Sequence, residues 1–182
     1  MIPQSTNEFQ FLPWQNDRKL VKVDFPLKHY YQQVFEKVQI CLHFPVSPHP
    51  SNDIRWWKMR KNGNGTVSTP YIIARNGDIW ELYDAKYWAW ALGGNSAMPA
   101  VIGRKDAEWL NKRSINIELT SWGPLHKEDG RYFHLSENKV RVYVDASEVV
   151  TYGDDFLGFR YYQIFPYKQL ESLYCLLYYL CN

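Results

Sequence analysis

The sequence has no large excess of charge, no long apolar run and few cysteines, and each absence excludes a class of protein. Its 182 residues carry a formal net charge of +2, too small for the basic surface that nucleic-acid binding requires. Three cysteines without a CxxC pair argue against a disulfide framework. No segment approaches the ~18 apolar residues of a membrane span. The N-terminus lacks a basic stretch followed by an apolar one, so we expect no signal peptide and a protein made in the cytoplasm.

Aromatic residues, by contrast, are abundant. They make up 17% of the chain and include 14 Tyr and 8 Trp. Such a density is typical of clefts that bind flat or sugar-like ligands, because each ring offers a large apolar face. A Trp-rich core with surface Tyr is an equally good interpretation. The length favours one domain, and the apolar fraction of 46% is ordinary for a globular protein.

The first part of the chain is rich in proline and then becomes strongly patterned. Residues 1–28 contain three prolines and predict an irregular N-terminal arm, followed by a single domain over residues 29–182. Residues 29–37 are compatible with a short helix. Residues 38–44 alternate between apolar and polar side chains, which predicts a strand. Val38, Ile40, Leu42 and Phe44 would form its core face, with His43 on the opposite face.

Later segments alternate between strand and helix signals. Ser51 or Asn52 is expected to cap a helix that runs to Met59. Asn76-Gly77 lies between two β-rich runs, residues 71–75 and 78–82, and predicts a hairpin. Residues 114–119 and 140–144 predict further strands, and an amphipathic helix is expected to begin at Pro166. The sequence therefore predicts an α/β domain with a central mixed β-sheet flanked by helices.

Two polar residues stand out on the predicted strands. His43 is at the end of its strand, opposite the expected core face, where a side chain can reach a cleft. Glu118 lies among isoleucines, and partial burial would raise its pKa toward that of a general base. Taken alone, a packed histidine and a solvated glutamate remain the simpler interpretations.

Five short segments carry a series of motifs that decides between these interpretations. They are residues 39–43 (QICLH), 67–79 (VSTPYIIARNGDI), 87–93 (YWAWALG), 111–119 (NKRSINIEL) and 161–173 (YYQIFPYKQLESL). In this order they resemble the type 2 family of N-acetylmuramoyl-L-alanine amidases, which includes phage amidase lysozymes and peptidoglycan recognition proteins. Each motif is weak alone, but the ordered series, covering about residues 38 to 180, is specific.

The resemblance implies an activity and a set of site residues. In that family a zinc ion, held by three side chains, polarises the amide between N-acetylmuramic acid and L-alanine and activates a water. Carried over by motif, His43 is the first zinc ligand and Glu118 the catalytic carboxylate. Tyr71 and Trp90 correspond to positions that line the substrate groove.

The sequence also departs from the family pattern. Ala91 stands where the family usually has a histidine near the groove. The family's second and third zinc ligands lie after the helix that begins near Pro166, and this sequence ends at Asn182, so we expect a C-terminally incomplete domain. A single histidine cannot make a catalytic zinc site. Four other residues are candidates to replace the missing ligands: Cys41, His49, His126 and His134. Cys41 shares a strand face with His43, but two positions along a strand span ~6.6 Å, an awkward distance for one metal.

Three explanations for this departure remain open. The chain is one part of an amidase that a second chain or a further segment completes, a degenerate amidase that binds peptidoglycan without cleaving it, or a structural part of a phage or secretion machine. In the leading interpretation it is a zinc-dependent peptidoglycan hydrolase, such as a phage endolysin. It would then act on the cell wall after release or delivery from the cytoplasm.

Overall fold

The computed structural model describes residues 18–60, 66–92 and 104–181. Its α-helices and two 3-10 helices are α1 (Pro50–Met59), α3 (Arg104–Arg113), α4 (Tyr167–Cys181), Leu27–His29 and Ala146–Glu148. Its strands are β1 (Leu20–Lys22), β2 (Gln39–His43), β3 (Tyr71–Ile73), β4 (Ile79–Glu81), β5 (Ser114–Leu119), β6 (Pro124–Glu128), β7 (Arg131–Leu135), β8 (Arg141–Val144), β9 (Val149–Phe156) and β10 (Phe159–Gln163). The strands form two five-stranded sheets.

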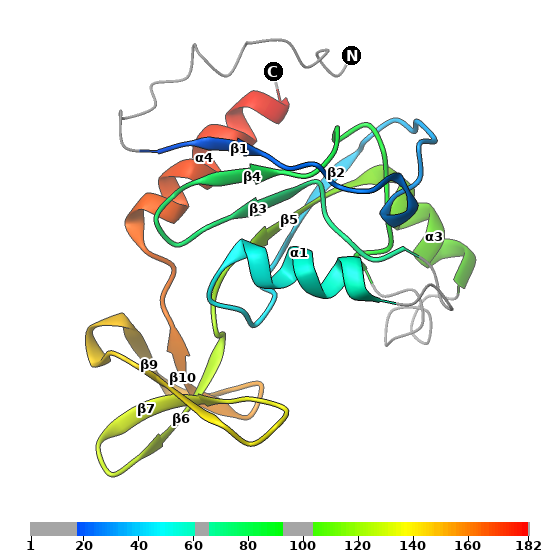
Figure 1. Cartoon of the computed structure of the whole chain (residues 1–182). Helices are drawn as coiled ribbons and strands as arrows, with labels where there is room; N and C mark the ends of the chain where they lie inside the picture. The colour runs from blue at the N-terminus through cyan, green and yellow to red at the C-terminus, as the bar shows by residue number, and fades with distance from the viewer. Residues whose placement is uncertain (1–17, 61–65, 93–103, 182) are drawn as a thin grey trace.

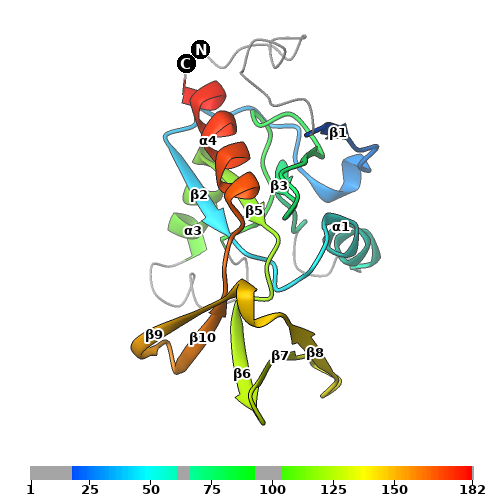
Figure 2. The same ribbon diagram turned by 90° about the vertical axis from the view of Figure 1, so that its left-hand side faces the viewer.

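The first sheet is mixed and has the strand order β1-β4-β3-β5-β2. β4 pairs antiparallel with β3, whereas the β1–β4, β3–β5 and β5–β2 pairs are parallel. Helices cover both faces: the sheet lies between α1 on one side and α4 on the other (Figures 1 and 2). This arrangement confirms the α/β fold with a central mixed sheet.

Two apolar cores separate the sheet from its covering helices. On the α4 side, Leu173 and Leu176 pack on Ile73 and Ile117, and Ile115 and Leu119 belong to the same cluster. On the α1 side, Ile54 and Trp57 pack with Ile72 of β3 and with Phe25. Since neighbouring residues of a strand point to opposite faces, β3 serves both cores, and all three of its residues are buried.

The predicted hairpin at Asn76-Gly77 is confirmed. An Asn-Gly pair often forms a two-residue turn in which both residues have positive φ, but the turn here is of another type. Only Gly77 has positive φ, at 92°, so the pair does not form a turn in which both central residues are left-handed. Gly77 N–H donates to the carbonyl of Ala74 at 2.9 Å, and Ala74 N–H donates to that of Asp78. These bonds are typical of a three-residue loop with glycine in the left-handed position.

The predicted strand at residues 38–44 is confirmed as β2, but its expected core face is wrong. Only Ile40 packs against the α4-side core. Val38, Leu42 and Phe44 are 54%, 51% and 45% exposed. The physical reason is that β2 is the outer strand of the sheet, next to β5 alone, so α4 does not cover its whole length.

The second sheet is antiparallel, with the order β8-β7-β6-β10-β9, and comprises residues 124–163. It is inserted between β5 and α4, and it lies beyond the end of the first sheet at which β5 ends (Figures 1 and 2). Only one of its strands, near residues 140–144, was predicted. The β6–β7 and β9–β10 turns each contain two successive positive-φ residues, Asp129-Gly130 and Leu157-Gly158.

Three smaller expectations also differ from the structure. Residues 30–37 are not helical, and only Leu27–His29 forms a 3-10 turn. Within the segment expected to be an irregular arm, β1 pairs with β4. His49, rather than Ser51 or Asn52, caps α1 by accepting a hydrogen bond from Ser51 N–H. Among the described helices, none is long and apolar enough to cross a membrane.

Candidate active site

The pairing of β2 with β5 brings His43 and Glu118 side by side. The two strands run parallel, and His43 is the register partner of Glu118, with Cys41 opposite Asn116. These polar side chains share one face of the sheet, because residues two apart on a strand point the same way. The other face of β5 carries Ile115, Ile117 and Leu119 against α4.

The ring of His43 is engaged by a neighbour on β5. Its Nε2 lies 2.9 Å from the side-chain oxygen Oδ1 of Asn116. Among the described residues, no three His, Cys, Asp or Glu side chains lie close enough together to hold a metal ion. One histidine with an occupied ring nitrogen does not meet the roughly three protein ligands of a catalytic zinc. The residues that the structure describes therefore do not fit a zinc site by themselves.

Glu118 is the most perturbed acid of the site. Its Oε2 is buried without a hydrogen-bond partner in the described structure. Burial and, to a smaller extent, the negative charge of Asp53 raise the pKa of Glu118 to about 8. A carboxyl group with such a pKa exchanges its proton close to neutral pH, which suits general acid–base chemistry.

Asp53, to which no sequence motif points, is a second buried acid facing the same space. It lies in the first turn of α1 and is 7% exposed. Burial raises the pKa of Asp53 to about 7, although a hydrogen bond with Ser47 acts in the opposite direction. One of its oxygens, Oδ2, is buried without a partner. Two acids with raised pKa values in one cleft are a feature of functional sites.

Both acids line a groove with a volume of about 710 Å3. This size lies within the range of small-molecule sites. One side of the groove comes from the loop before α1 and from α1, and another comes from Trp122, the end of β7 and the residues after it. The lining residues are Pro45, Val46, Ser47, Pro48, Asn52, Asp53, Arg55, Trp56, Trp57, Met59, Val67, Glu118, Trp122, His134, Ser136, Glu137 and Asn138.

Tyr71 and Trp90, which the family resemblance assigns to the substrate groove, do not line this groove. Tyr71 packs in the α4-side core, where burial and the charge of Glu81 raise the pKa of its hydroxyl well above the ordinary value. Trp90 is buried in a separate cluster with Trp88 and Ala107. Ala91 donates its backbone N–H to the Asn111 side chain at 2.7 Å.

The residues considered as substitute metal ligands are dispersed. Cys41 lies 3.8 Å from Ser114 Oγ, and His49 is engaged in capping α1. His126 stacks on Phe133 within the second sheet. His134 reaches the groove, but it stacks on Trp122 with ring centroids 4.9 Å apart and planes inclined by 14°.

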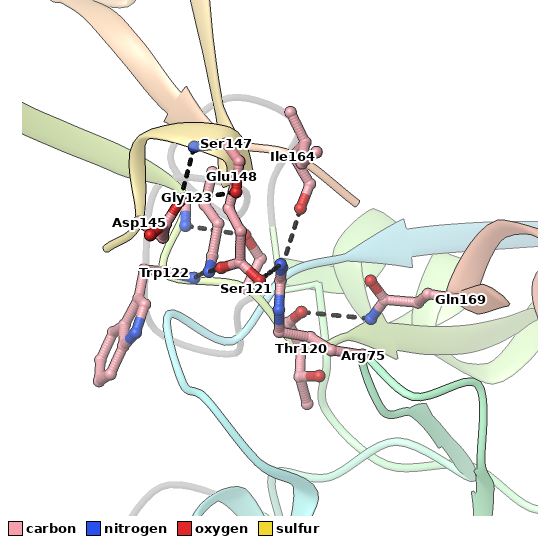
Figure 3. Close-up of polar contacts among 11 residues, drawn as sticks. Arg75, Thr120, Ser121, Trp122, Gly123, Asp145, Ser147, Glu148, Ile164 and Gln169 are labelled. Atoms are coloured by element: carbon pink, nitrogen blue, oxygen red, sulfur yellow. Dashed lines mark hydrogen bonds and ion pairs between the residues drawn. The ribbon is translucent and has the colours of Figure 1, made fainter. Parts of the chain in front are cut away.

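A polar network joins the second sheet to the first beside the groove (Figure 3). Arg75, from the loop between β3 and β4, pairs with Glu148 at 3.0 Å and donates to the carbonyl of Ile164. The Gln163 side chain donates to Glu148 and accepts the backbone N–H of Trp122 at 2.8 Å. We call these five residues the junction; it fixes the backbone at Trp122 while the indole points away from it.

The sequence held partial signals for the residues that were missed. Asp53 is a charged residue in a predicted amphipathic helix, where a solvated position is the ordinary interpretation. Trp122 lies three residues beyond the end of the strand that carries Glu118, and loop residues at strand ends often line sites. Asp129-Gly130 is a strong hairpin signal that would have indicated β6 and β7.

Of three comparisons with known proteins, one gives a match. No curated protein and no solved structure matches the chain. The family model described as N-acetylmuramoyl-L-alanine amidase matches residues 38–182, from the start of the β2 segment to the C-terminus. This match covers most of the sequence, and it includes His43, Glu118 and the whole second sheet. The chain therefore belongs to the N-acetylmuramoyl-L-alanine amidase family.

Proposed function

We propose that this chain is a peptidoglycan amidase that cleaves the amide bond between N-acetylmuramic acid and L-alanine, with Glu118 as its proton-transfer group. Family membership supports the substrate class and the hydrolase chemistry. The observation that carries the proposal is a carboxyl group with a pKa near 8 that lines a groove of suitable size. Its place of action is the bacterial cell wall, reached after release or delivery.

The position of Glu118 defines its chemical role. During hydrolysis the oxygen of a water attacks the amide carbonyl carbon, the carbon–nitrogen bond breaks, and the alanine nitrogen leaves with an added proton. A group that takes a proton from the water and returns one to the nitrogen balances these steps. A side chain with a pKa close to the working pH performs both transfers most readily. Glu118 meets this requirement because it is partly buried beside Asp53.

The proposed reaction also uses a zinc ion. The family resemblance assigns His43 to a zinc ion, which would supply Lewis-acid activation when bound. Because the described residues provide only this one candidate ligand, the remaining ligands would have to come from outside them, for instance from a second chain. Since Asn116 contacts Nε2, His43 would bind the metal either through Nδ1 or by exchanging this contact for it.

One observation favours a second candidate function, binding of peptidoglycan without cleavage. The side chain of Asn116 occupies a ring nitrogen of His43, so it competes with a metal ion for that nitrogen. If this contact prevents His43 from binding zinc, the chain would keep its groove but could not activate a water for hydrolysis. It would then act as a recognition module or as a docking part of a larger machine.

Hydrolysis of purified muropeptides distinguishes the two functions. Mass spectrometry would follow release of the stem peptide by the wild-type chain, with zinc content measured on the same samples. We expect cleavage that falls by about a hundredfold or more in Glu118→Gln, the ordinary effect of removing a general acid–base group. Glu36→Gln, at an exposed carboxylate outside the groove, is the matched control.

Three results would contradict parts of this proposal. Binding of muropeptide with no cleavage at any zinc concentration would establish the recognition module instead. Cleavage that survives Glu118→Gln would refute the role of Glu118. Zinc that stays bound in His43→Ala would refute the role of His43.

A further inference from the structure

The second sheet gives the groove a side that lies beyond the strand carrying Glu118. Trp122 lies just after β5, His134 belongs to β7, and Ser136 to Asn138 follow β7. All of them line the same groove as Glu118. A part of the substrate that extends from the scissile amide along this side of the groove therefore contacts the second sheet.

An aromatic surface forms the centre of this side. The rings of Trp122 and His134 stack nearly parallel, with centroids 4.9 Å apart. Burial lowers the pKa of His134, so its ring is neutral at physiological pH and the stack carries no charge. The junction holds the Trp122 backbone through the Gln163 side chain at 2.8 Å. The indole is consequently presented from a fixed support.

The opposite side of the groove offers a second indole. Trp56 of α1 is 53% exposed, and the Arg60 guanidinium lies over its ring at 4.6 Å. An exposed indole beside a groove offers a large apolar face, with a polar N–H at its edge, to a ligand in that groove. Aromatic faces thus enter the groove from α1 and from the second sheet.

We infer that Trp56 and Trp122 form a saccharide subsite, in which the pyranose rings of the glycan strand stack while the scissile amide lies at Glu118. This inference rests on the proposed function, because it names which half of the peptidoglycan substrate occupies this part of the groove. Pyranose rings have apolar faces that suit indoles, and hydroxyl and acetamido groups that suit polar side chains. Ser136, Glu137 and Asn138 supply such side chains next to the aromatic stack.

The groove carries little net charge near neutral pH, which suits uncharged sugars next to the scissile bond. Asp53 and Glu118 line it with raised pKa values, so protonation removes much of their negative charge. Glu137 is offset by Arg55, the single arginine among the lining residues. Glu137 can accept hydrogen bonds from sugar hydroxyls.

Binding measurements with two matched probes test the subsite. One probe is a muropeptide that carries its disaccharide, and the other is the same stem peptide without sugars. Isothermal titration would use the full chain in a Glu118→Gln background, so that the substrate is not consumed. We expect Trp56→Ala and Trp122→Ala each to weaken binding of the muropeptide on the order of tenfold, the value of one good stacking contact. Binding of the sugar-free peptide should stay unchanged.

Trp109→Ala is a close control for Trp56→Ala. Trp109 lies on α3, is 51% exposed and has the Arg113 guanidinium over its ring at 5.3 Å, but it does not line the groove. Its removal should leave both probes unaffected. Trp56 is the decisive position because an exposed residue can be removed without unfolding the chain, whereas Trp122 also supports the junction.

Each outcome has a distinct meaning. A muropeptide affinity that is unchanged in Trp56→Ala and Trp122→Ala, or one that falls equally for both probes, would overturn the saccharide subsite and leave the proposed function standing. No binding of either probe by the starting chain would overturn the proposed function and the subsite together. A loss confined to the muropeptide would establish the subsite.

Discussion

Replacing Glu118 with glutamine should make the protein more stable at alkaline pH, by an amount that grows with pH. In the unfolded chain this carboxyl has a pKa of 4.5, whereas in the folded chain burial raises it to about 8. Below pH 4.5 both states are protonated and the carboxyl has no net effect. Between the two values the folded state retains a proton that the unfolded state releases, so wild-type stability falls as pH rises. Each pKa unit corresponds to about 1.4 kcal/mol, which gives a total on the order of 5 kcal/mol above pH 8.

Urea unfolding of wild type and Glu118→Gln at several pH values from 4.5 to 9 would measure this effect. EDTA in every sample would keep cations out of the groove. Because glutamine cannot ionise, its stability advantage over the wild type should be smallest at pH 4.5 and largest at pH 9. Glu36→Gln removes an exposed carboxylate and should have a small effect at each pH. A difference between wild type and Glu118→Gln that does not change with pH would refute the assignment of a raised pKa to Glu118.

Two further predictions concern the hairpin and the junction. Gly77→Ala should cost about 1–3 kcal/mol, because its φ of 92° disfavours a side chain and the new Cβ would lie 2.9 Å from the Lys168 carbonyl oxygen. Gly153→Ala, with nothing within 4 Å of its Cβ, is the control, and equal losses in urea unfolding would contradict the steric argument. Arg75→Met should cost about 1–3 kcal/mol by removing the pair with Glu148 and should expose the second sheet to limited proteolysis. An unchanged cleavage pattern would show that the junction does not hold the sheet.

The elements of the first sheet were predictable because their patterns are set by burial on one face. β5 alternates Ile115, Ile117 and Leu119 with polar residues, and α4 covers the apolar side of the strand. The Asn76-Gly77 signal is local and needs no knowledge of the rest of the chain. The error at β2 shows the limit of such patterns. Alternation predicts a strand, but it does not tell which strand lies at the edge of the sheet.

The second sheet was largely missed because it buries little of its surface. All but the first two residues of β9 are exposed, so burial imposes no apolar alternation on them. Strands of this kind are fixed by their turns and partners rather than by a core. The paired positive-φ positions at Asp129-Gly130 and Leu157-Gly158 carry the information that the apolar pattern lacks.

The composition of the site depends on contacts between distant segments. His43 and Glu118 were identified as candidates from motifs, and the parallel pairing of β2 with β5 places them together. The Asn116 contact with His43 depends on the register between those strands, which no local pattern specifies. In the same way, Asp53 reaches the space around Glu118 only because α1 packs over the sheet.

The insertion of residues 124–163 has a consequence for how such proteins diversify. The two ends of this segment lie side by side. Gln163 N–H donates to the Gly123 carbonyl at 2.9 Å, and Tyr162 is the register partner of Pro124. Segments whose two ends lie close together can be exchanged or lengthened at little cost in chain entropy to the folding of the rest of the domain. Grafting a different segment at this point would change which ligands meet the mouth of the groove, while the strand bearing the reacting carboxyl stays intact. Evolution can therefore vary selectivity and chemistry as separate traits on one scaffold.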